Sequence, residues 1–272
     1  MRTALSKIPA PALAGVVREA TAATATAEIR NCLYSGADMI DLHVSCLERD
    51  DVATLRGIIE STSLPVLALH YNIGSTGQGL DLPEEDRVAA MLRAVEAGAA
   101  GIDLQGYTFH RPSKDGFCGE NRYSFTKDGP KEVVTDEAVI AKQMELIDRV
   151  HAAGAEVLLS CHPGVVLNAE QVVELALFME QRKPDIIKIV SVAKTEEDMA
   201  ESIRAMIALK KEVRTPVAYH ANGAAGMLSR VVNPVLGGQI AFCVDRYKEG
   251  STLEQPDLRT VRSIVDNMKK IK

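Results

Sequence analysis

The stretch Asp185–Ala221, DIIKIVSVAKTEEDMAESIRAMIALKKEVRTPVAYHA, contains one complete strand–helix–strand repeat. It begins with an apolar run, Asp185–Val192, continues with a segment of helical periodicity, Glu196–Lys211, and ends with a second apolar run, Pro216–Ala221. Continuous apolar runs are typical of parallel strands that are covered on both faces. The stretch therefore predicts two parallel strands joined by a crossover helix.

The same alternation recurs along the whole chain. Strands are expected at Leu13–Val17, Asp38–Val44, Pro65–Tyr71, Gly101–Gly106, Glu156–His162, Asp185–Val192, Pro216–Ala221 and Gln239–Val244. Helices are expected at Thr24–Ser35, Asp51–Ser61, Glu84–Ala97, Asp136–Ala153, Ala169–Arg182, Glu196–Lys211, Gly226–Leu236 and Asp257–Lys270. Eight strand–helix units predict an α/β protein, a (β/α)8 TIM barrel that forms a single domain over residues 1–272. A doubly wound open sheet is the competing fold, but no G-x-G-x-x-G follows the first strand.

Helix-terminal residues agree with this interpretation. Gly36, Gly98 and Gly154 each follow a predicted helix just ahead of a strand, where a left-handed residue ends many helices. Thr195 and Asp198 have the spacing of a capping box at the beginning of their helix.

Composition excludes several classes of protein. The 272 residues are 46% hydrophobic but only 4% aromatic, with no Trp, which excludes a disordered or collagen-like chain. The net charge is −6, and basic residues form no stripe, so nucleic acid is not an expected partner. The five cysteines are widely spaced and include no C-x-x-C pair, as in reduced cytosolic proteins. The apolar run Ile8–Val17 contains two prolines and is too short to cross a membrane. We therefore expect a cytoplasmic protein with no membrane contact.

One segment interrupts the alternation. Residues 107–134, after the fourth strand, show no helical periodicity and predict an inserted loop. Five of the eleven aromatic residues lie in it: Tyr107, Phe109, Phe117, Tyr123 and Phe125. A loop of this kind serves as a lid or substrate wall, or as a subunit contact, and the sequence favours neither.

Polar residues gather at the predicted C-terminal ends of the strands, where active sites of such barrels lie. They are Asp41, His43, His70, Tyr71, Asp103, Gln105, Ser160, His162, Lys188, Lys194, His220, Asn222 and Asp245. Lys188 stands within the sixth apolar run, where burial disfavours the charged ammonium and favours the neutral, nucleophilic amine. His162 ends the neighbouring fifth strand and can exchange a proton near neutral pH. Together they suggest imine formation with a ketone, followed by proton abstraction beside the imine carbon.

Three motifs resemble the type I 3-dehydroquinate dehydratases: Ser-Cys-His at residues 160–162, Ile-Ile-Lys-Ile-Val-Ser-Val-Ala-Lys-Thr at 186–195 and Ala-Gly-Met-Leu-Ser-Arg at 225–230. The resemblance implies a Schiff-base lyase of the shikimate pathway that needs no metal or other cofactor and is a homodimer. It implies that Lys188 forms the imine and that His162 is the general acid–base. It also implies that Arg230 binds the carboxylate of a small substrate, which suits a planar guanidinium.

The sequence also departs from the family pattern. Asp41 and His43 stand where the family carries Glu and Arg in the second strand, and Tyr71 replaces an arginine at the third. Asp103 keeps an acidic position, whereas Gln105 replaces a glutamate, and His220 and Asn222 replace methionines. The resemblance assigns substrate contacts to Asp41, His43, Tyr71, Asp103, Ser251 and Gln255. Because two expected arginines are missing, the substrate is either 3-dehydroquinate or a related hydroxyketone or cyclic ketoacid handled by an imine-forming lyase or aldolase.

A metal-dependent barrel hydrolase is the alternative from another class. His43, His70, His162 and His220 all lie at strand ends, with Asp41 and Asp103 nearby in the sequence pattern. The first strand, Leu13–Val17, lacks the His-x-His of many such hydrolases. A non-catalytic binding barrel would not explain why Lys188 stands within an apolar strand. We therefore expect no metal site.

Overall fold

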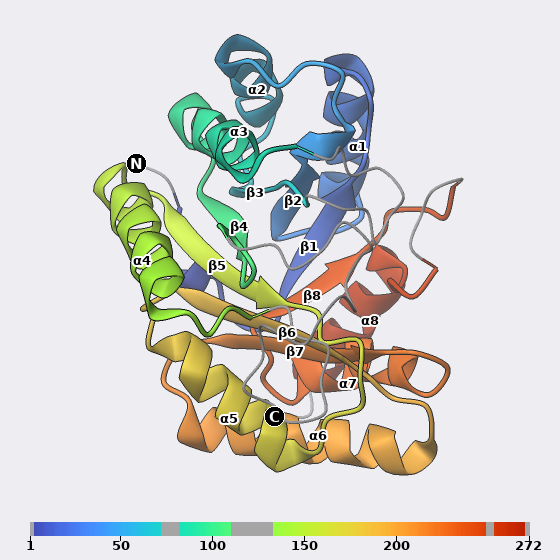
Figure 1. Ribbon diagram of the computed structural model, residues 1–272. Coiled ribbons are helices and arrows are strands. Elements are labelled where there is room, and N and C mark those ends of the chain that lie inside the picture. Colours follow the sequence, from blue (N-terminus) through green and yellow to red (C-terminus); the bar gives the residue numbers. More distant parts are fainter. Residues whose placement is uncertain (1–2, 72–81, 110–132, 249–252, 270–272) are drawn as a thin grey trace. The chain divides into compact units, whose positions relative to one another are not determined.

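The computed structural model describes residues 3–71, 82–109, 133–248 and 253–269 (Figure 1). Its strands are β1 (Ala12–Val17), β2 (Met39–His43), β3 (Val66–Leu69), β4 (Gly101–Gln105), β5 (Glu156–Cys161), β6 (Ile186–Val192), β7 (Val217–Asn222) and β8 (Ile240–Cys243). Its α-helices are α1 (Ala22–Tyr34), α2 (Val52–Ile59), α3 (Glu84–Ala97), α4 (Glu137–Ala152), α5 (Ala169–Glu180), α6 (Glu196–Glu212), α7 (Ser229–Val235) and α8 (Leu258–Lys269). Short 3-10 helices are η1 (Leu5–Lys7), η2 (Val44–Cys46) and η3 (Gly226–Leu228).

The strands follow one another in a single sheet in the order β7-β6-β5-β4-β3-β2-β1-β8. A doubly wound sheet would reverse its strand order at a switch point, and this order has none. The predicted (β/α)8 barrel is therefore confirmed.

The structure divides into two compact units. The first contains residues 1–103, 150–156 and 241–272, and the second contains residues 104–149 and 157–240. The prediction of a single folding domain stays a prediction.

In the first unit, β1, β2 and β3 pair in parallel, with Val16 opposite Asp41 and His43 opposite Leu69. Helices α1, α2 and α3 cover the outer side of these strands (Figure 1). Small residues allow close packing: a Cβ on Gly15 of β1 would lie 2.6 Å from the Cβ of Cys32 in α1. Helix and strand therefore approach each other more closely here than a larger side chain would permit.

In the second unit, β5, β6 and β7 pair in parallel and α5, α6 and α7 lie against them (Figure 1). Successive residues of a strand point to opposite faces. One face meets the helices, since Cys161 Sγ lies 3.6 Å from Met179 Sδ of α5. On this face Ser191 Oγ of β6 also hydrogen-bonds with Tyr219 Oη of β7 at 2.9 Å. The opposite face therefore carries Ser160, Lys188 and His220.

Helix ends follow most of the local predictions. Thr195 and Asp198 form the predicted capping box, and Gly36, Gly98 and Gly154 have positive φ, as predicted. Several boundaries differ from the predicted ones. Helix α1 begins at Ala22, before the predicted Thr24, because Thr21 and Thr24 form a capping box of their own.

The segment predicted as one helix, Gly226–Leu236, is a 3-10 turn, η3, followed by α7. A Cβ on Gly226 would lie 2.7 Å from backbone atoms of Ala221, so this first turn passes directly against the end of β7.

No helix in the described part of the chain is both long and apolar enough to cross a membrane.

Candidate active site

Lys188 lies within β6 and is buried, with 5% of its surface exposed. In the parallel pairing it stands opposite Ser160 of β5 on one side and Ala218 of β7 on the other. Hydrophobic residues flank it along its own strand. The amine is therefore placed inside the protein, on the face of β6 that points away from the helices.

His162 follows β5 by one residue and is half-buried. Because Ser160 is in register with Lys188, His162 continues the same alternation two residues further on. The strand pairing thus places the predicted imine-forming lysine opposite Ser160, two residues before the predicted acid–base, His162.

His220 of β7 lies on this face as well, and it is buried, with 5% exposed. Burial holds the pKa of His220 well below 6.5, and Arg230, Lys188 and His162 lower it further. The imidazole is therefore neutral at physiological pH. Arg230, Lys188 and His162 therefore lie near enough to His220 for their charges to act on it.

Arg230 is the second residue of α7 and is 7% exposed. Its Nη2 donates a hydrogen bond to Oδ1 of Asn222, the last residue of β7. Ser229 fixes this arrangement, because its Oγ accepts from the Ala221 amide at 2.7 Å and donates to the Gly226 carbonyl at 2.5 Å. The Ser-Arg pair that the sequence singled out is thus held against the end of β7.

Four of the predicted substrate-binding residues lie in the first unit. Asp41 and His43 belong to β2, Tyr71 follows β3, and Asp103 lies in β4 opposite Leu69. All four are buried, and the register places Asp41, His43 and Asp103 on one face of the strands. His43 Nε2 lies 3.5 Å from Asp41 Oδ2, and the His43 and Tyr71 rings are 6.4 Å apart between centroids.

Arg18 is a residue of this group that the sequence reasoning missed. It follows β1 by one residue, and its Nε donates to His43 Nε2 at 3.5 Å. Arg18 therefore places an arginine beside His43, the residue that stands where the family carries arginine in the second strand. A basic residue directly after the first predicted strand was the signal that could have revealed it.

The predicted residues of the last loop are only partly described. Ser251 lies outside the described residues. Gln255 is 8% exposed, its carbonyl accepts from the Tyr247 hydroxyl at 2.9 Å, and its Oε1 is buried with no hydrogen-bond partner in the parts of the chain that the structure describes.

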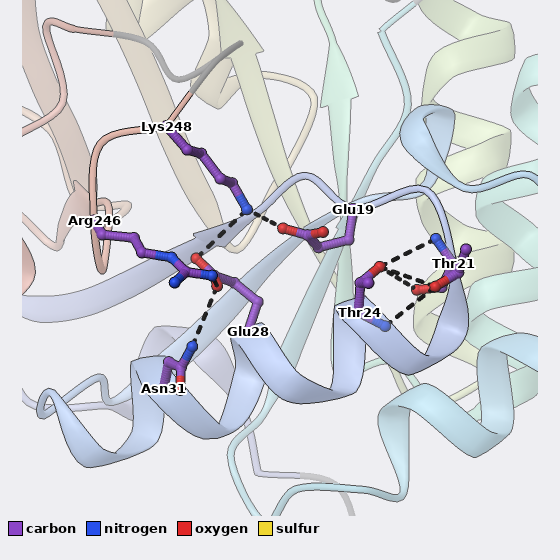
Figure 2. Close-up of polar contacts among 7 residues, drawn as sticks. All are labelled: Glu19, Thr21, Thr24, Glu28, Asn31, Arg246 and Lys248. Carbon is purple, nitrogen blue, oxygen red and sulfur yellow. Dashed lines mark hydrogen bonds and ion pairs between the residues drawn. The ribbon is translucent and has the colours of Figure 1, made fainter.

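An ionic cluster holds the beginning of this loop to α1 (Figure 2). Glu28, whose side chain is 4% exposed, lies 3.7 Å from Lys248 Nζ and 3.6 Å from Arg246 Nη2. Lys248 also contacts Glu19. Burial lowers the pKa of Lys248.

The predicted inserted loop is described only at its ends, since residues 110–132 lie outside the described residues, and with them Phe117, Tyr123 and Phe125. Tyr107 and Val134 pack together against Val139 and Ile140 of α4. As for the hydrolase alternative, no group of three His, Cys, Asp or Glu side chains suited to a metal ion occurs among residues 3–71, 82–109, 133–248 and 253–269.

The family model for type I 3-dehydroquinase matches residues 125–272, more than half of the chain. The chain belongs to the type I 3-dehydroquinase family. It is therefore a hydro-lyase. The matched part includes His162, Lys188, Arg230 and Gln255, whereas Asp41, His43, Tyr71 and Asp103 precede it.

Individual relatives agree with this family membership. A 3-dehydroquinate dehydratase from Aromatoleum aromaticum is 24% identical over 206 residues, which are 75% of this chain and 68% of the relative. Among solved structures, the 3-dehydroquinate dehydratase of Geobacillus kaustophilus has a TM-score of 0.76 at 15% identity, covering 98% of this chain and 99% of the other.

The type I enzyme of Clostridium difficile, solved with covalently modified comenic acid, has a TM-score of 0.77 at 15% identity and covers 97% of this chain and 94% of its own. At these identities the solved structures show that this member of the type I 3-dehydroquinase family shares their fold.

Proposed function

We propose that this protein dehydrates 3-dehydroquinate to 3-dehydroshikimate through an imine on Lys188. The observation that carries the proposal is a buried lysine, 5% exposed, in register with Ser160, two residues before His162, with the charges of both Lys188 and His162 acting on His220. Burying a lysine among isoleucines and valines is unfavourable, and a reaction that uses the amine gives a reason for it.

The reaction begins at the ring ketone. Nζ of Lys188 attacks the C3 carbonyl carbon, His162 gives a proton to the hydroxyl of the resulting carbinolamine, and this hydroxyl leaves as water to form a protonated imine. That iminium accepts electrons, which makes the C2–H bond acidic. His162 removes the C2 proton, the electron pair forms an enamine, and the C1–O bond then breaks. The departing hydroxyl takes a proton from His162 and leaves as water, and hydrolysis of the imine releases the enone and restores the amine.

Arg230 binds the substrate carboxylate in this proposal, with Gln255 and Ser251 as further contacts. A guanidinium can form two parallel hydrogen bonds with a carboxylate. Asp41, His43, Tyr71 and Asp103 keep the substrate-binding role that the family resemblance assigns to them.

Borohydride reduction tests the imine. Treatment with 3-dehydroquinate and borohydride is expected to add one substrate-derived mass to Lys188, located by peptide mass spectrometry. Lys194, an exposed lysine six residues further on, is the matched control: Lys194→Ala keeps the adduct and Lys188→Ala loses it. An adduct on another residue, or none with 3-dehydroquinate or a related hydroxyketone, contradicts the mechanism.

A second candidate function is the same imine-assisted elimination on a different hydroxyketone or cyclic ketoacid. It is favoured by His43 and Tyr71, which replace arginines and precede the part of the chain that the family model matches. Each lost charge-assisted contact changes binding by about 1.5–3 kcal/mol, enough to change substrate preference. A direct assay of turnover with 3-dehydroquinate and with a panel of related hydroxyketones and cyclic ketoacids separates the two candidates. Slower turnover of 3-dehydroquinate than of another ketone in this panel favours the second candidate function.

We also propose that the protein acts as a cytoplasmic homodimer with a small carboxylate substrate and with neither nucleic acid nor membrane as a partner. The family resemblance and the charge distribution support this. Light scattering of the purified protein tests the dimer, and cell fractionation tests the location.

A further inference from the structure

Asn222 ends β7 on the same face as Lys188, because Val192 of β6 stands opposite it and Lys188 lies four residues earlier in that strand. It is half-buried, and its Oδ1 accepts a hydrogen bond from Arg230 Nη2. The amide oxygen thus takes one of the donors of a guanidinium that is itself 7% exposed.

The backbone of Arg230 is fixed independently of this contact. Ser229 binds both the amide of Ala221 and the carbonyl of Gly226, so the first turn of α7 is tied to β7. Beyond Cβ, however, an arginine side chain has several rotatable bonds, and a hydrogen bond to its tip reduces the number of orientations that it occupies. Because the contact is charge-assisted, it is stronger than a bond between neutral groups.

We propose that Asn222 is a positioning residue that orients the guanidinium of Arg230 for a substrate carboxylate. The neutral amide suits this role, since it holds the cation without neutralising it, as an aspartate would. The inference rests on the proposed function in so far as Arg230 is the carboxylate-binding residue.

Quinate, which has the carboxylate and hydroxyl groups but no ketone, is the probe for this role. Its affinity is measured by calorimetry on the full chain, so that no imine is involved. Asn222→Ala is expected to weaken quinate binding about tenfold, as loss of one charge-assisted contact would. In a double-mutant cycle, Asn222→Ala has little further effect once Arg230→Ala is present, because both changes remove one function.

Two further readouts separate positioning from a general structural role. Asn222→Asp keeps an acceptor for Arg230 but adds a negative charge, so it is expected to weaken quinate binding more than Asn222→Ala does. Trapping of cyclohexanone on Lys188, which needs no carboxylate site, is expected to be unchanged in both variants.

Unchanged quinate affinity in Asn222→Ala, independent effects in the double mutant, or no measurable binding of quinate by the unaltered protein would each overturn the inference. An adduct of 3-dehydroquinate on Lys188 would leave the proposed function intact in those cases. If Asn222→Ala and Arg230→Ala weaken quinate binding in a coupled way, but no adduct of 3-dehydroquinate forms on Lys188, the inference is supported and the imine mechanism is contradicted.

Discussion

Arg182, two residues after α5, donates a hydrogen bond from Nε to Oε1 of Gln143 in α4 at 2.9 Å. Arg182 also donates to the Val134 carbonyl at 2.6 Å, and Gln143 donates to the carbonyls of Gly106 and Thr108 at 3.1 and 2.9 Å. The pair therefore binds both ends of the segment that the sequence predicts as an inserted loop. Burial lowers the pKa of Arg182 to about 10, so it is still charged at neutral pH.

Gln143→Leu is expected to lower the free energy of unfolding by about 2–4 kcal/mol, because it removes the hydrogen bonds that Gln143 makes with the buried Arg182 and with the carbonyls of Gly106 and Thr108. Denaturant unfolding measures this change. Glu145→Leu, an exposed position in the same helix, is the control and changes stability by no more than about 0.5 kcal/mol. Equal effects of the two substitutions would contradict the role of the pair.

Acid is expected to destabilise the protein through His220 and His70. Burial is the largest cause that lowers the pKa of each below 6.5. Below about pH 6.5 the unfolded chain binds protons that the folded chain does not, so the free energy of unfolding falls as the pH decreases. Above about pH 6.5 both states are unprotonated at these histidines, and their full contribution to stability is present. Each histidine contributes at most about 1.4 kcal/mol per pH unit.

His220→Gln should make this pH dependence shallower between neutral pH and the lowered pKa. The measurement is urea unfolding at a series of pH values. A slope identical to that of the unaltered protein would show that His220 is protonated in the folded state as easily as in the unfolded one.

Gly15→Ala should destabilise the protein by about 1–3 kcal/mol, because the new methyl group would overlap the side chain of Cys32. Gly57→Ala is the matched control. It lies exposed within α2 with no atom near the added carbon, so it should stabilise by about 0.5–1 kcal/mol. Thermal or denaturant unfolding tests both, and a stabilising Gly15→Ala would contradict the observed packing.

Glu28→Ala should destabilise by about 2 kcal/mol, since it removes the buried carboxylate that Lys248 and Arg246 share (Figure 2). Arg49→Ala breaks an exposed ion pair with Asp51 and should change stability by less than about 0.5 kcal/mol. Urea unfolding compares the two variants. No loss of stability in Glu28→Ala would show that the cluster contributes little.

His162→Ala should reduce turnover of the substrate by about 10²–10⁴-fold, the usual contribution of a general acid–base. Imine formation with Lys188 should remain detectable but slower, because the lysine is intact. Steady-state kinetics and borohydride trapping measure the two effects separately. Full turnover in His162→Ala would exclude its acid–base role.

Much of the fold could be predicted because its signals are local. Continuous apolar runs, helical periodicity and residues such as Gly98 and Thr195 each report on their own neighbourhood in the chain, and eight repetitions leave few possible folds. Lys188 could be singled out for the same reason, since a lysine between isoleucines and valines is conspicuous in any strand. The start of α1 at Ala22 was missed because two threonines, 21 and 24, can each cap a helix.

The sequence by itself determined the order of strands and helices, the candidate lysine and histidine, and the motifs of the family. Only the tertiary structure decided which side chains meet: Arg18 with His43, Asn222 with Arg230, and Gln143 with Arg182. Such contacts depend on strand register and on how a helix packs against its strand. These are set by the burial of many side chains together, and no short stretch of sequence encodes them.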